Sequence, residues 1–275
     1  MLQEIYPDQL DNSFKQKEIH DDAWVVQVSK QGLLSKKDGK YVRFYTYKEL
    51  QEANIHFKQI VYGFQIASHD VFIGLDRTMI ENYTYTPLRT FIAQSQQVVS
   101  YAASSAYHLA QWYRRYRYCG HCGSAFHHST SERALVCEVC GNIEYPRINP
   151  AVIVAVISGD RLLLTKYAGR EYARFALVAG FVEIGETVEE ACQREVKEEV
   201  GINIKNLRYY KSQPWGVSES ILMGFYAEVD GDTKITLDEE ELALAQWLKV
   251  DEIGDDFSTD SLTGQMIQNF KDGNH

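Results

Sequence analysis

Three glutamates, Glu195, Glu198 and Glu199, stand at a spacing that could bind metal. Side chains three and four positions apart project from one face of a helix, so these carboxylates would lie close together. Their repulsion is unfavourable by itself. Divalent cations such as Mg²⁺ or Mn²⁺ relieve it because they prefer carboxylate and water oxygens. The alternative that the helix alone leaves open is an exposed acidic face, partly neutralised by Arg194 and Lys197.

The segment around these glutamates carries the signals of a well-bounded helix. Thr187 and Glu190 form a capping box, which predicts a helix that begins at Val188. Gly201 follows the last periodic residue and predicts a left-handed C-cap. Apolar residues at helical spacing predict the buried stripe: Val188, Ala191, Cys192, Val196 and Val200. Cys192 is interpreted as a small core residue and not as a nucleophile.

The other four cysteines form two Cys-x-x-Cys pairs with fourteen residues between them: Cys119, Cys122, Cys137 and Cys140. Each pair predicts a tight turn, and two such turns supply four thiolates in the closed tetrahedral arrangement of a structural Zn²⁺ site. With four cysteines present, the nearby histidines are interpreted as exposed residues: His121, His127 and His128. Three arginines precede the first pair, and they indicate either a solvated helix end or a nucleic-acid contact: Arg114, Arg115 and Arg117.

The segment 180–202 reads G-x5-E-x7-R-E-V-x-E-E-x-G-I. It resembles the Nudix box at these positions: Gly180, Glu186, Arg194, Glu195, Glu198, Glu199, Gly201 and Ile202. The resemblance to Nudix hydrolases implies cleavage of a nucleoside diphosphate linked to another moiety. It implies that Glu195, Glu198 and Glu199 are catalytic and hold Mg²⁺ or Mn²⁺, and that Arg194 pairs with Glu186. The structural positions are then Gly180, Glu186, Arg194 and Gly201. Either Glu198 or Glu199 is expected to take the proton from water.

A second motif downstream resembles the NADH pyrophosphatase branch of this family. Ser212-Gln-Pro-Trp215 is followed by Ser220, as in the branch, although Gly216-Val217-Ser218 replaces its Pro-Phe-Pro. The branch also carries a zinc ribbon after an N-terminal β domain. The resemblance implies hydrolysis of NADH or NAD⁺ to nicotinamide mononucleotide and AMP. The alternatives are removal of NAD caps from RNA, hydrolysis of a dinucleoside polyphosphate, and a nucleotide-sensing regulator without activity.

The same resemblance implies further site residues. Glu241 matches an additional acidic metal ligand, and Tyr145 and Phe181 match aromatic residues that stack on a substrate ring. The complete set of implied substrate contacts is Tyr145, Ala179, Phe181, Gln213, Trp215, Ser220 and Thr263. The resemblance also implies a homodimer.

An α+β organisation is expected to position these residues. Short β-type runs predict a mostly β N-terminal domain over 1–87, and a helix follows over 88–117. A zinc ribbon is expected over 118–145. The resemblance implies a Nudix α/β/α sandwich over 146–275. Within it, the pattern predicts strands over 151–157 and 161–165, a turn at 158–160 and a strand over 175–178.

Composition sets the remaining limits. The 275 residues are 45% hydrophobic and 24% charged, as in folded globular proteins. The net charge of −10 lies mostly after residue 117, which argues against extensive gripping of nucleic-acid phosphates. The longest apolar run, Ala151–Ile157, is too short to span a membrane. No secretory signal is visible at the start, and two Cys-x-x-Cys pairs suit a reducing compartment, so a cytoplasmic protein is expected.

Overall fold

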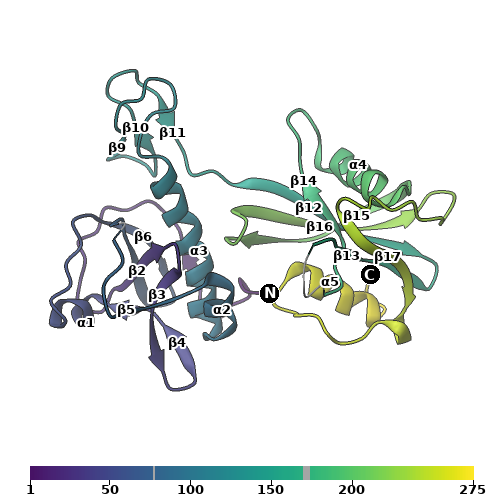
Figure 1. Cartoon of the computed structure of the whole chain (residues 1–275), viewed down its shortest axis with the longest axis horizontal. Helices are drawn as coiled ribbons and strands as arrows, with labels where there is room; N and C mark the ends of the chain where they lie inside the picture. The colour runs from purple at the N-terminus through teal and green to yellow at the C-terminus, as the bar shows by residue number, and fades with distance from the viewer. Residues whose placement is uncertain (77, 170–173) are drawn as a thin grey trace. The chain divides into compact units, whose positions relative to one another are not determined.

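The computed structural model describes residues 1–76, 78–169 and 174–275. Contacts within the chain divide it into two compact units (Figure 1). The N-terminal unit comprises Leu2–Arg147 and a short later segment, Trp215–Glu219. The C-terminal unit comprises Ile148–Pro214 and Ser220–His275, together with Met1. Each unit has its own hydrophobic core.

The elements of the N-terminal unit are mostly short strands. They are β1 (Leu10–Asp11), β2 (Trp24–Ser29), β3 (Gly32–Asp38), β4 (Tyr41–Arg43), β5 (Tyr45–Thr46), α1 (Tyr47–Glu52), β6 (Ile60–Ile66), β7 (His69–Gly74), β8 (Thr84–Thr86), α2 (Leu88–Ala93), α3 (Gln97–Arg115), β9 (His127–His128), β10 (Leu135–Val136) and β11 (Ile143–Glu144). The first eight strands form one sheet, in which β1, β6, β7, β2, β3 and β4 are successive neighbours. The last three strands form a separate small sheet.

Helix α3 packs into the core of this unit. Its apolar face includes Ala102, Ala106 and Trp112, which are buried against strands β2, β6 and β7. The sequence predicts one helix over 88–117, and this prediction is wrong because the chain breaks between Ala93 and Gln97. At the break, the Ser95 hydroxyl donates to the Val42 carbonyl at 2.7 Å. The Val42 backbone N–H also donates to the Gln94 carbonyl at 2.9 Å, so this carbonyl at the break is bonded to β4 and not within a helix.

The C-terminal unit is built on a mixed six-stranded sheet. Its elements are β12 (Asn149–Ser158), β13 (Arg161–Tyr167), β14 (Val178–Phe181), α4 (Val188–Val200), β15 (Ile204–Trp215), β16 (Ser220–Val229), β17 (Leu242–Lys249), η1 (Val250–Glu252) and α5 (Leu262–Lys271). The main sheet order is β15-β16-β12-β13-β17, and β14 pairs with β12. The turn at 158–160 is confirmed. The strand predicted over 175–178 instead starts at Val178.

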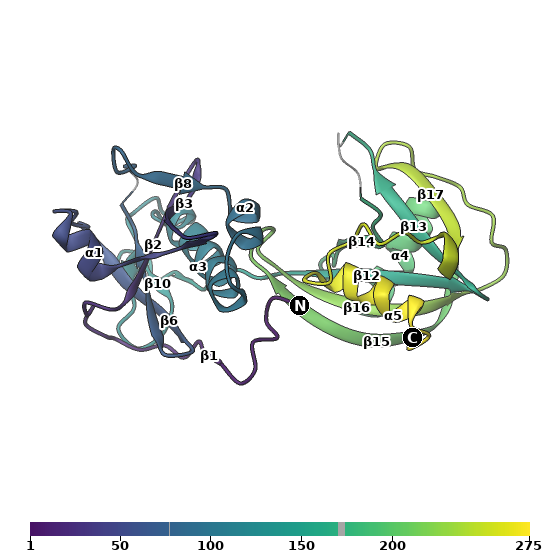
Figure 2. The ribbon, with the colours of Figure 1, turned by 90° about the horizontal axis from the view of Figure 1, so that it is seen from below.

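Two helices cover opposite faces of this sheet (Figure 2). On β12, Val152, Val154 and Val156 pack in the cluster that contains α4. The alternate residues Ile153, Ala155 and Ile157 pack in the cluster that contains α5. Successive side chains of a strand point to opposite faces, so an uninterrupted apolar run is what a strand between two helices requires.

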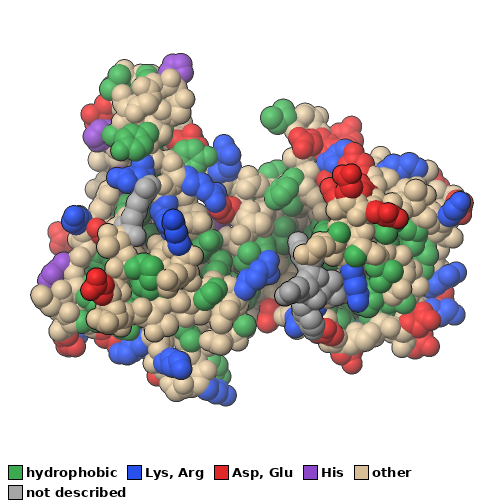
Figure 3. All heavy atoms as spheres, in the orientation of Figure 1, with side chains coloured by type: hydrophobic (Ala, Val, Ile, Leu, Met, Phe, Trp, Pro, Cys, Tyr) green, Lys and Arg blue, Asp and Glu red, His purple; other side chains and the backbone are tan. Residues whose placement is uncertain are grey.

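The described surface is unevenly charged. Acidic side chains gather over α4 (Figure 3), where the three box glutamates lie. In the described part of the chain, no helix combines the length and the apolar character needed to cross a membrane.

Candidate functional site

Local signals in the sequence set the helix that carries the site. Thr187 accepts a hydrogen bond from the Glu190 backbone N–H, and the Glu190 carboxylate accepts one from the Thr187 backbone N–H. The helix therefore begins at Val188 as predicted. It ends at Gly201, which has a φ of 74°. Of the predicted apolar stripe, Ala191, Cys192, Val196 and Val200 are buried and Val188 is half-buried.

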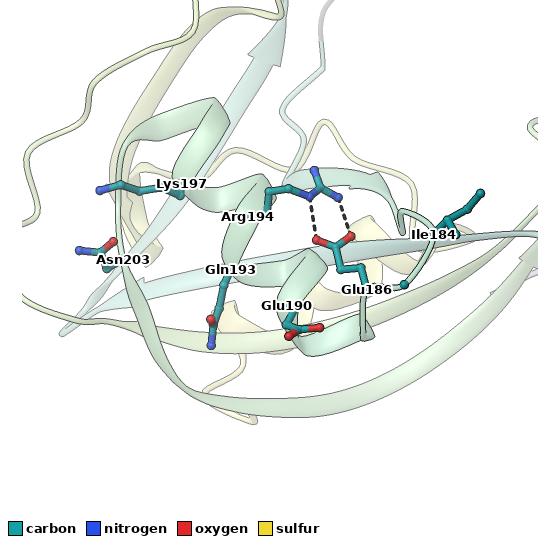
Figure 4. Close-up of a pocket in the computed structure, with 8 residues that line it drawn as sticks. Ile184, Glu186, Glu190, Gln193, Arg194, Lys197 and Asn203 are labelled. Carbon is teal, nitrogen blue, oxygen red and sulfur yellow. Dashed lines mark hydrogen bonds and ion pairs between the residues drawn. The ribbon is translucent and has the colours of Figure 1, made fainter.

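Arg194 braces the loop that precedes the helix. Its Nε and Nη2 donate to the two oxygens of Glu186 at 2.8 and 2.9 Å (Figure 4). Nη2 also donates to the Phe181 carbonyl at 2.9 Å, and Nη1 donates to Glu195 and Glu198 at 2.7 and 3.0 Å. One guanidinium therefore ties three carboxylates and the end of β14 together. Hydrogen bonds from Arg194 lower the pKa of Glu186 to about 2.

Replacing this fork provides a stability test. Arg194→Lys keeps the positive charge but cannot make the paired bonds, so the melting temperature should fall by about 5 °C at pH 7. Because the folded-state pKa of Glu186 is depressed, its contribution is present above pH 4.5 and is lost as the pH falls toward about 2. The difference between the two proteins should shrink over that range. Arg161→Lys, at an exposed arginine, is the control in the same calorimetric series. An equal loss in both variants would contradict the bracing role.

Two of the three box glutamates are buried. Glu195 is 9% exposed and Glu199 is 2% exposed, although both carry a carboxylate. Glu199 Oε2 is buried without a hydrogen-bond partner within the described residues. Burial, together with the neighbouring charges of Glu195 and Glu241, raises the pKa of Glu199 to about 8. Burial also raises the pKa of Glu195, against the opposing effect of Arg194.

This arrangement fits a divalent cation. A buried carboxylate oxygen without a partner is costly, and oxygen coordination to a hard cation would remove that cost. Glu198 is different, because 60% of its side chain is exposed and it contacts Arg194. Glu241 is exposed just before β17 and raises the pKa of both buried glutamates through its charge. Asp238 also raises the pKa of Glu199. Asp238 was not predicted, because its loop has no periodic pattern.

Gly180 is required by the position of Glu195. A Cβ atom on Gly180 would lie 2.0 Å from the carboxyl group of Glu195. No real Cβ tolerates such a contact, so the box glycine lets the buried carboxylate lie against β14. Ala179 precedes it on the same strand, opposite Ile153, and its backbone N–H donates to Glu199.

The four paired cysteines come together in the N-terminal unit. Their Sγ atoms lie within 4.8 Å of one another, and they are the one such group of metal-binding side chains found in the described residues. The two turns are alike. The N–H of Gly123 donates to the Cys119 carbonyl at 2.9 Å, and the N–H of Gly141 donates to the Cys137 carbonyl at 2.8 Å. Both glycines have a φ near 77°, which favours glycine. Four convergent thiols fit a structural Zn²⁺.

The predicted aromatic contacts lie in different units. Tyr145 belongs to the N-terminal unit, is 52% exposed and donates to Glu132 at 3.1 Å. Phe181 ends β14 in the C-terminal unit and is 51% exposed. Thr263 lies half-buried in the first turn of α5.

Gln213 and Ser220 are buried. The Gln213 amide donates to the Asp260 carbonyl at 2.9 Å and accepts from the Leu262 N–H at 2.7 Å, so it holds the start of α5. Ser220 is the first residue of β16, where it pairs with Asn149. A direct substrate contact of either residue remains a prediction. The anchoring of α5 by Gln213 has no signal in the sequence.

The segment Trp215–Glu219 runs from the last residue of β15 to the residue before β16, and it belongs to the N-terminal unit. The Gly216 N–H donates to the Ser104 hydroxyl at 3.1 Å, and a Cβ atom on Gly216 would lie 2.0 Å from the Ser104 carbonyl oxygen. The Arg89 guanidinium lies 5.9 Å from the centre of the Trp215 ring. The departure from Pro-Phe-Pro therefore accompanies a close contact with α3.

The basic residues before the ribbon have distinct environments. Arg115 forms an ion pair with Glu219, and Arg114 donates to the Val28 carbonyl at 3.1 Å. Arg117 is exposed. Two of the three arginines are therefore engaged within the N-terminal unit.

Comparison with protein families identifies one domain in each unit. Residues 147–270 match the NUDIX domain family, so the C-terminal unit is of the Nudix class. Residues 114–145 match the NADH pyrophosphatase zinc ribbon domain. The chain thus combines a Nudix domain with the zinc ribbon of NADH pyrophosphatases, and the resemblance predicted from the sequence is confirmed.

Two curated relatives share one name. The chain is 41% identical over 166 residues to the "NAD-capped RNA hydrolase NudC" of Photorhabdus laumondii, which covers 60% of this chain and 64% of that protein. It is 43% identical over 145 residues to the protein of the same name from Klebsiella pneumoniae, covering 53% and 56%. The matches therefore span about three fifths of the length of these relatives.

A solved structure confirms the fold. The crystal structure of a NUDIX hydrolase from Nitrosomonas europaea matches with a TM-score of 0.50 and 20% identity, over 57% of this chain and 91% of that one. The predicted α+β class, with a Nudix sandwich preceded by a zinc ribbon, is confirmed.

Proposed function

We propose that this protein hydrolyses the pyrophosphate bond of NADH or NAD⁺ to give nicotinamide mononucleotide and AMP. The observation that carries this proposal is the buried Glu199 Oε2, which has no hydrogen-bond partner among the described residues and lies near Glu195 within the matched Nudix domain. Such a site suits substitution at a phosphorus atom whose surrounding negative charge must be neutralised.

Each charged side chain at the site has a proposed role. Glu195, Glu198, Glu199 and Glu241 are the proposed ligands for Mg²⁺ or Mn²⁺. The bound cation would neutralise phosphate oxygens and acidify a water molecule. The hydrogen bond from Arg194 Nη1 holds the Glu195 carboxylate in position. Glu198 or Glu199 accepts the proton from the attacking water.

The substrate side of the proposal is broader. Tyr145, Ala179, Phe181, Gln213, Trp215, Ser220 and Thr263 are the proposed substrate contacts. Removal of NAD caps from RNA is the second candidate, because the curated relatives are named for that activity. Because Gly216-Val217-Ser218 replaces the Pro-Phe-Pro of the related branch, another dinucleotide, such as a dinucleoside polyphosphate, is a further candidate substrate. We further propose a cytoplasmic homodimer with domains at 1–87, 118–145 and 146–275.

A product assay tests the proposal. Purified protein with Mg²⁺ or Mn²⁺ is incubated with NADH, NAD⁺, NAD-capped RNA or a dinucleoside tetraphosphate, and the products are separated by chromatography. AMP and reduced nicotinamide mononucleotide from NADH, lost in Glu198→Gln, are the expected result. Faster turnover of another substrate would reassign specificity. The absence of product from every substrate, with folded protein and bound metal, would favour the nucleotide-sensing alternative.

The contact between Gly180 and Glu195 gives a second test of the same site. Gly180→Ala introduces a Cβ atom that displaces the Glu195 carboxylate, so the hydrolysis rate should fall by about a hundredfold. Gly254→Ala is the matched control because a Cβ atom there meets nothing within 4 Å. Steady-state rates at saturating metal compare the two variants. Wild-type activity in Gly180→Ala would show that the position of the Glu195 carboxylate does not matter for hydrolysis.

A further inference from the structure

The N-terminal unit contains a cavity that the proposed hydrolysis does not use. It has a volume of about 450 Å³ and lies among Lys58 and Gln59, three residues after β7 (Leu75, Asp76 and Thr78), the C-terminal end of α3 and the ribbon. This volume lies in the range of roughly 300–1,000 Å³ that is usual for small-ligand sites. All of its lining residues belong to one unit.

Positive charge dominates the cavity. Of the described residues, Lys58, Arg114 and Arg117 line it together with one acid, Asp76. The Asp76 carboxylate is already engaged by the backbone N–H groups of Lys58 and Gln59, at 2.9 and 3.5 Å. Within the described residues, neither the Lys58 ammonium nor the Arg117 guanidinium forms a salt bridge. Lys and Arg side chains gather below the ribbon strands, at the end of α3 (Figure 3). These two cations can therefore bind an anion.

Aromatic rings form the other part of the lining. Tyr118 is 63% exposed at the cavity. Tyr113 stacks on His128 with 5.1 Å between ring centres, and His128 Nε2 lies 3.0 Å from the Gln59 amide nitrogen. The Tyr113 and His128 rings are thus fixed by neighbouring groups, while the Tyr118 ring is free to receive a planar ligand.

We propose that this cavity binds a nucleotide. Cations for a phosphate beside aromatic faces for a base are the combination by which proteins bind single nucleotides and unpaired strands. Lys58 and Arg117 contact the phosphate, and Tyr118 stacks on the base. The ligand is either a free nucleotide or one nucleotide of an RNA chain. The inference does not depend on the proposed hydrolysis, because the cavity shares no residue with the Nudix box.

Binding without divalent cation tests the proposal. The full chain with its zinc is titrated against a fluorescently labelled pentaadenylate that has a 5′-hydroxyl and therefore no pyrophosphate. AMP is added as competitor. Lys58→Ala combined with Arg117→Ala should weaken binding by about tenfold and reduce the slope of log K against log salt by about 1.4. Tyr118→Leu should weaken it by about fivefold, and Tyr118→Phe should restore it.

The matched control removes equal charge elsewhere on the same unit. Lys37→Ala with Lys40→Ala, at exposed positions of β3 and the following turn, should leave binding unchanged. Competition by AMP would assign the cavity to any nucleotide, and RNA binding without competition would assign it to an RNA chain. AMP binding measured by calorimetry without RNA binding would assign it to free nucleotides. No binding of either ligand, or equal weakening by the cavity and control pairs, would overturn the proposal. NADH hydrolysis by the cavity variants should stay at the wild-type rate, so this outcome is separate from that of the proposed function.

Discussion

Glu199→Gln is expected to lower the rate of pyrophosphate hydrolysis at least about a hundredfold. The glutamine keeps the shape of the side chain but removes the charge that would hold a cation and the base that would take a proton. Glu189→Gln, at an exposed glutamate in the first turn of the same helix, is the matched control and should keep activity. Initial rates with NADH and Mg²⁺ or Mn²⁺ make the comparison. Comparable activity in Glu199→Gln and wild type would show that Glu199 takes no part in the reaction.

The same substitution should have the opposite effect on stability. Burial raises the pKa of Glu199 from 4.5 to about 8, so the folded protein binds an extra proton between these pH values. Without divalent cation, stability should therefore fall as the pH rises through this range, because the charged form must be buried. Glu199→Gln removes that penalty. It should melt at least about 3 °C above wild type at pH 8 and close to wild type at pH 4.5.

Added divalent cation should reverse the order of the two melting temperatures at pH 8. A ligand that binds only the folded state stabilises it, so Mn²⁺ should raise the melting temperature of the wild type more than that of Glu199→Gln. Calorimetric scans at pH 8 with and without Mn²⁺ measure both effects. If metal-free Glu199→Gln melts below the wild type, then Glu199 stabilises the fold, and the predicted penalty for burying its charge is wrong.

The second large effect is expected when one thiol of the zinc ribbon is removed. Cys137→Ser should abolish zinc binding and unfold the ribbon, because the bound metal supplies most of the folding free energy of such small sites. Cys137 is fully buried and its sulfur lies 3.4 Å from that of Cys122. Cys192→Ser is the matched control, since Cys192 is equally buried but lies in the helix of the Nudix box.

Two measurements follow from this comparison. Metal analysis should find one zinc per chain in the wild type and in Cys192→Ser, and none in Cys137→Ser. Limited proteolysis should cut the Cys137→Ser protein first between residues 118 and 145. Retained zinc in Cys137→Ser would show that three thiols suffice, with another ligand such as His121 completing the site.

The box helix could be predicted from sequence because its signals are local. Thr187, Glu190 and Gly201 set its ends through bonds within a few residues, and the periodic apolar residues set its buried face. The zinc site could be predicted for a similar reason, since each pair of cysteines defines its own turn. The burial of Glu195 and Glu199 is different. Periodicity places both on one face, but only β14 and Gly180 bring a strand close enough to bury them.

Features that depend on distant segments could not be predicted. The break between α2 and α3 depends on bonds to Val42, which lies some fifty residues earlier in the chain. The anchoring of α5 by Gln213 joins residues 47 and 49 positions apart. In both cases the residues next to the polar side chain in the sequence do not indicate its hydrogen-bond partner. The fold determines that partner.

The close approach of Gly216 to α3 couples two positions in evolution. A proline at 216 would lose the N–H that bonds Ser104 and would bring its ring against the Ser104 carbonyl. The Pro-Phe-Pro loop of the related branch therefore cannot arise here by one substitution at a time without passing through a destabilised intermediate. Either the loop or helix α3 must shift first. Divergence in this loop is thus expected to be epistatic, with changes near Ser104 preceding those at Gly216.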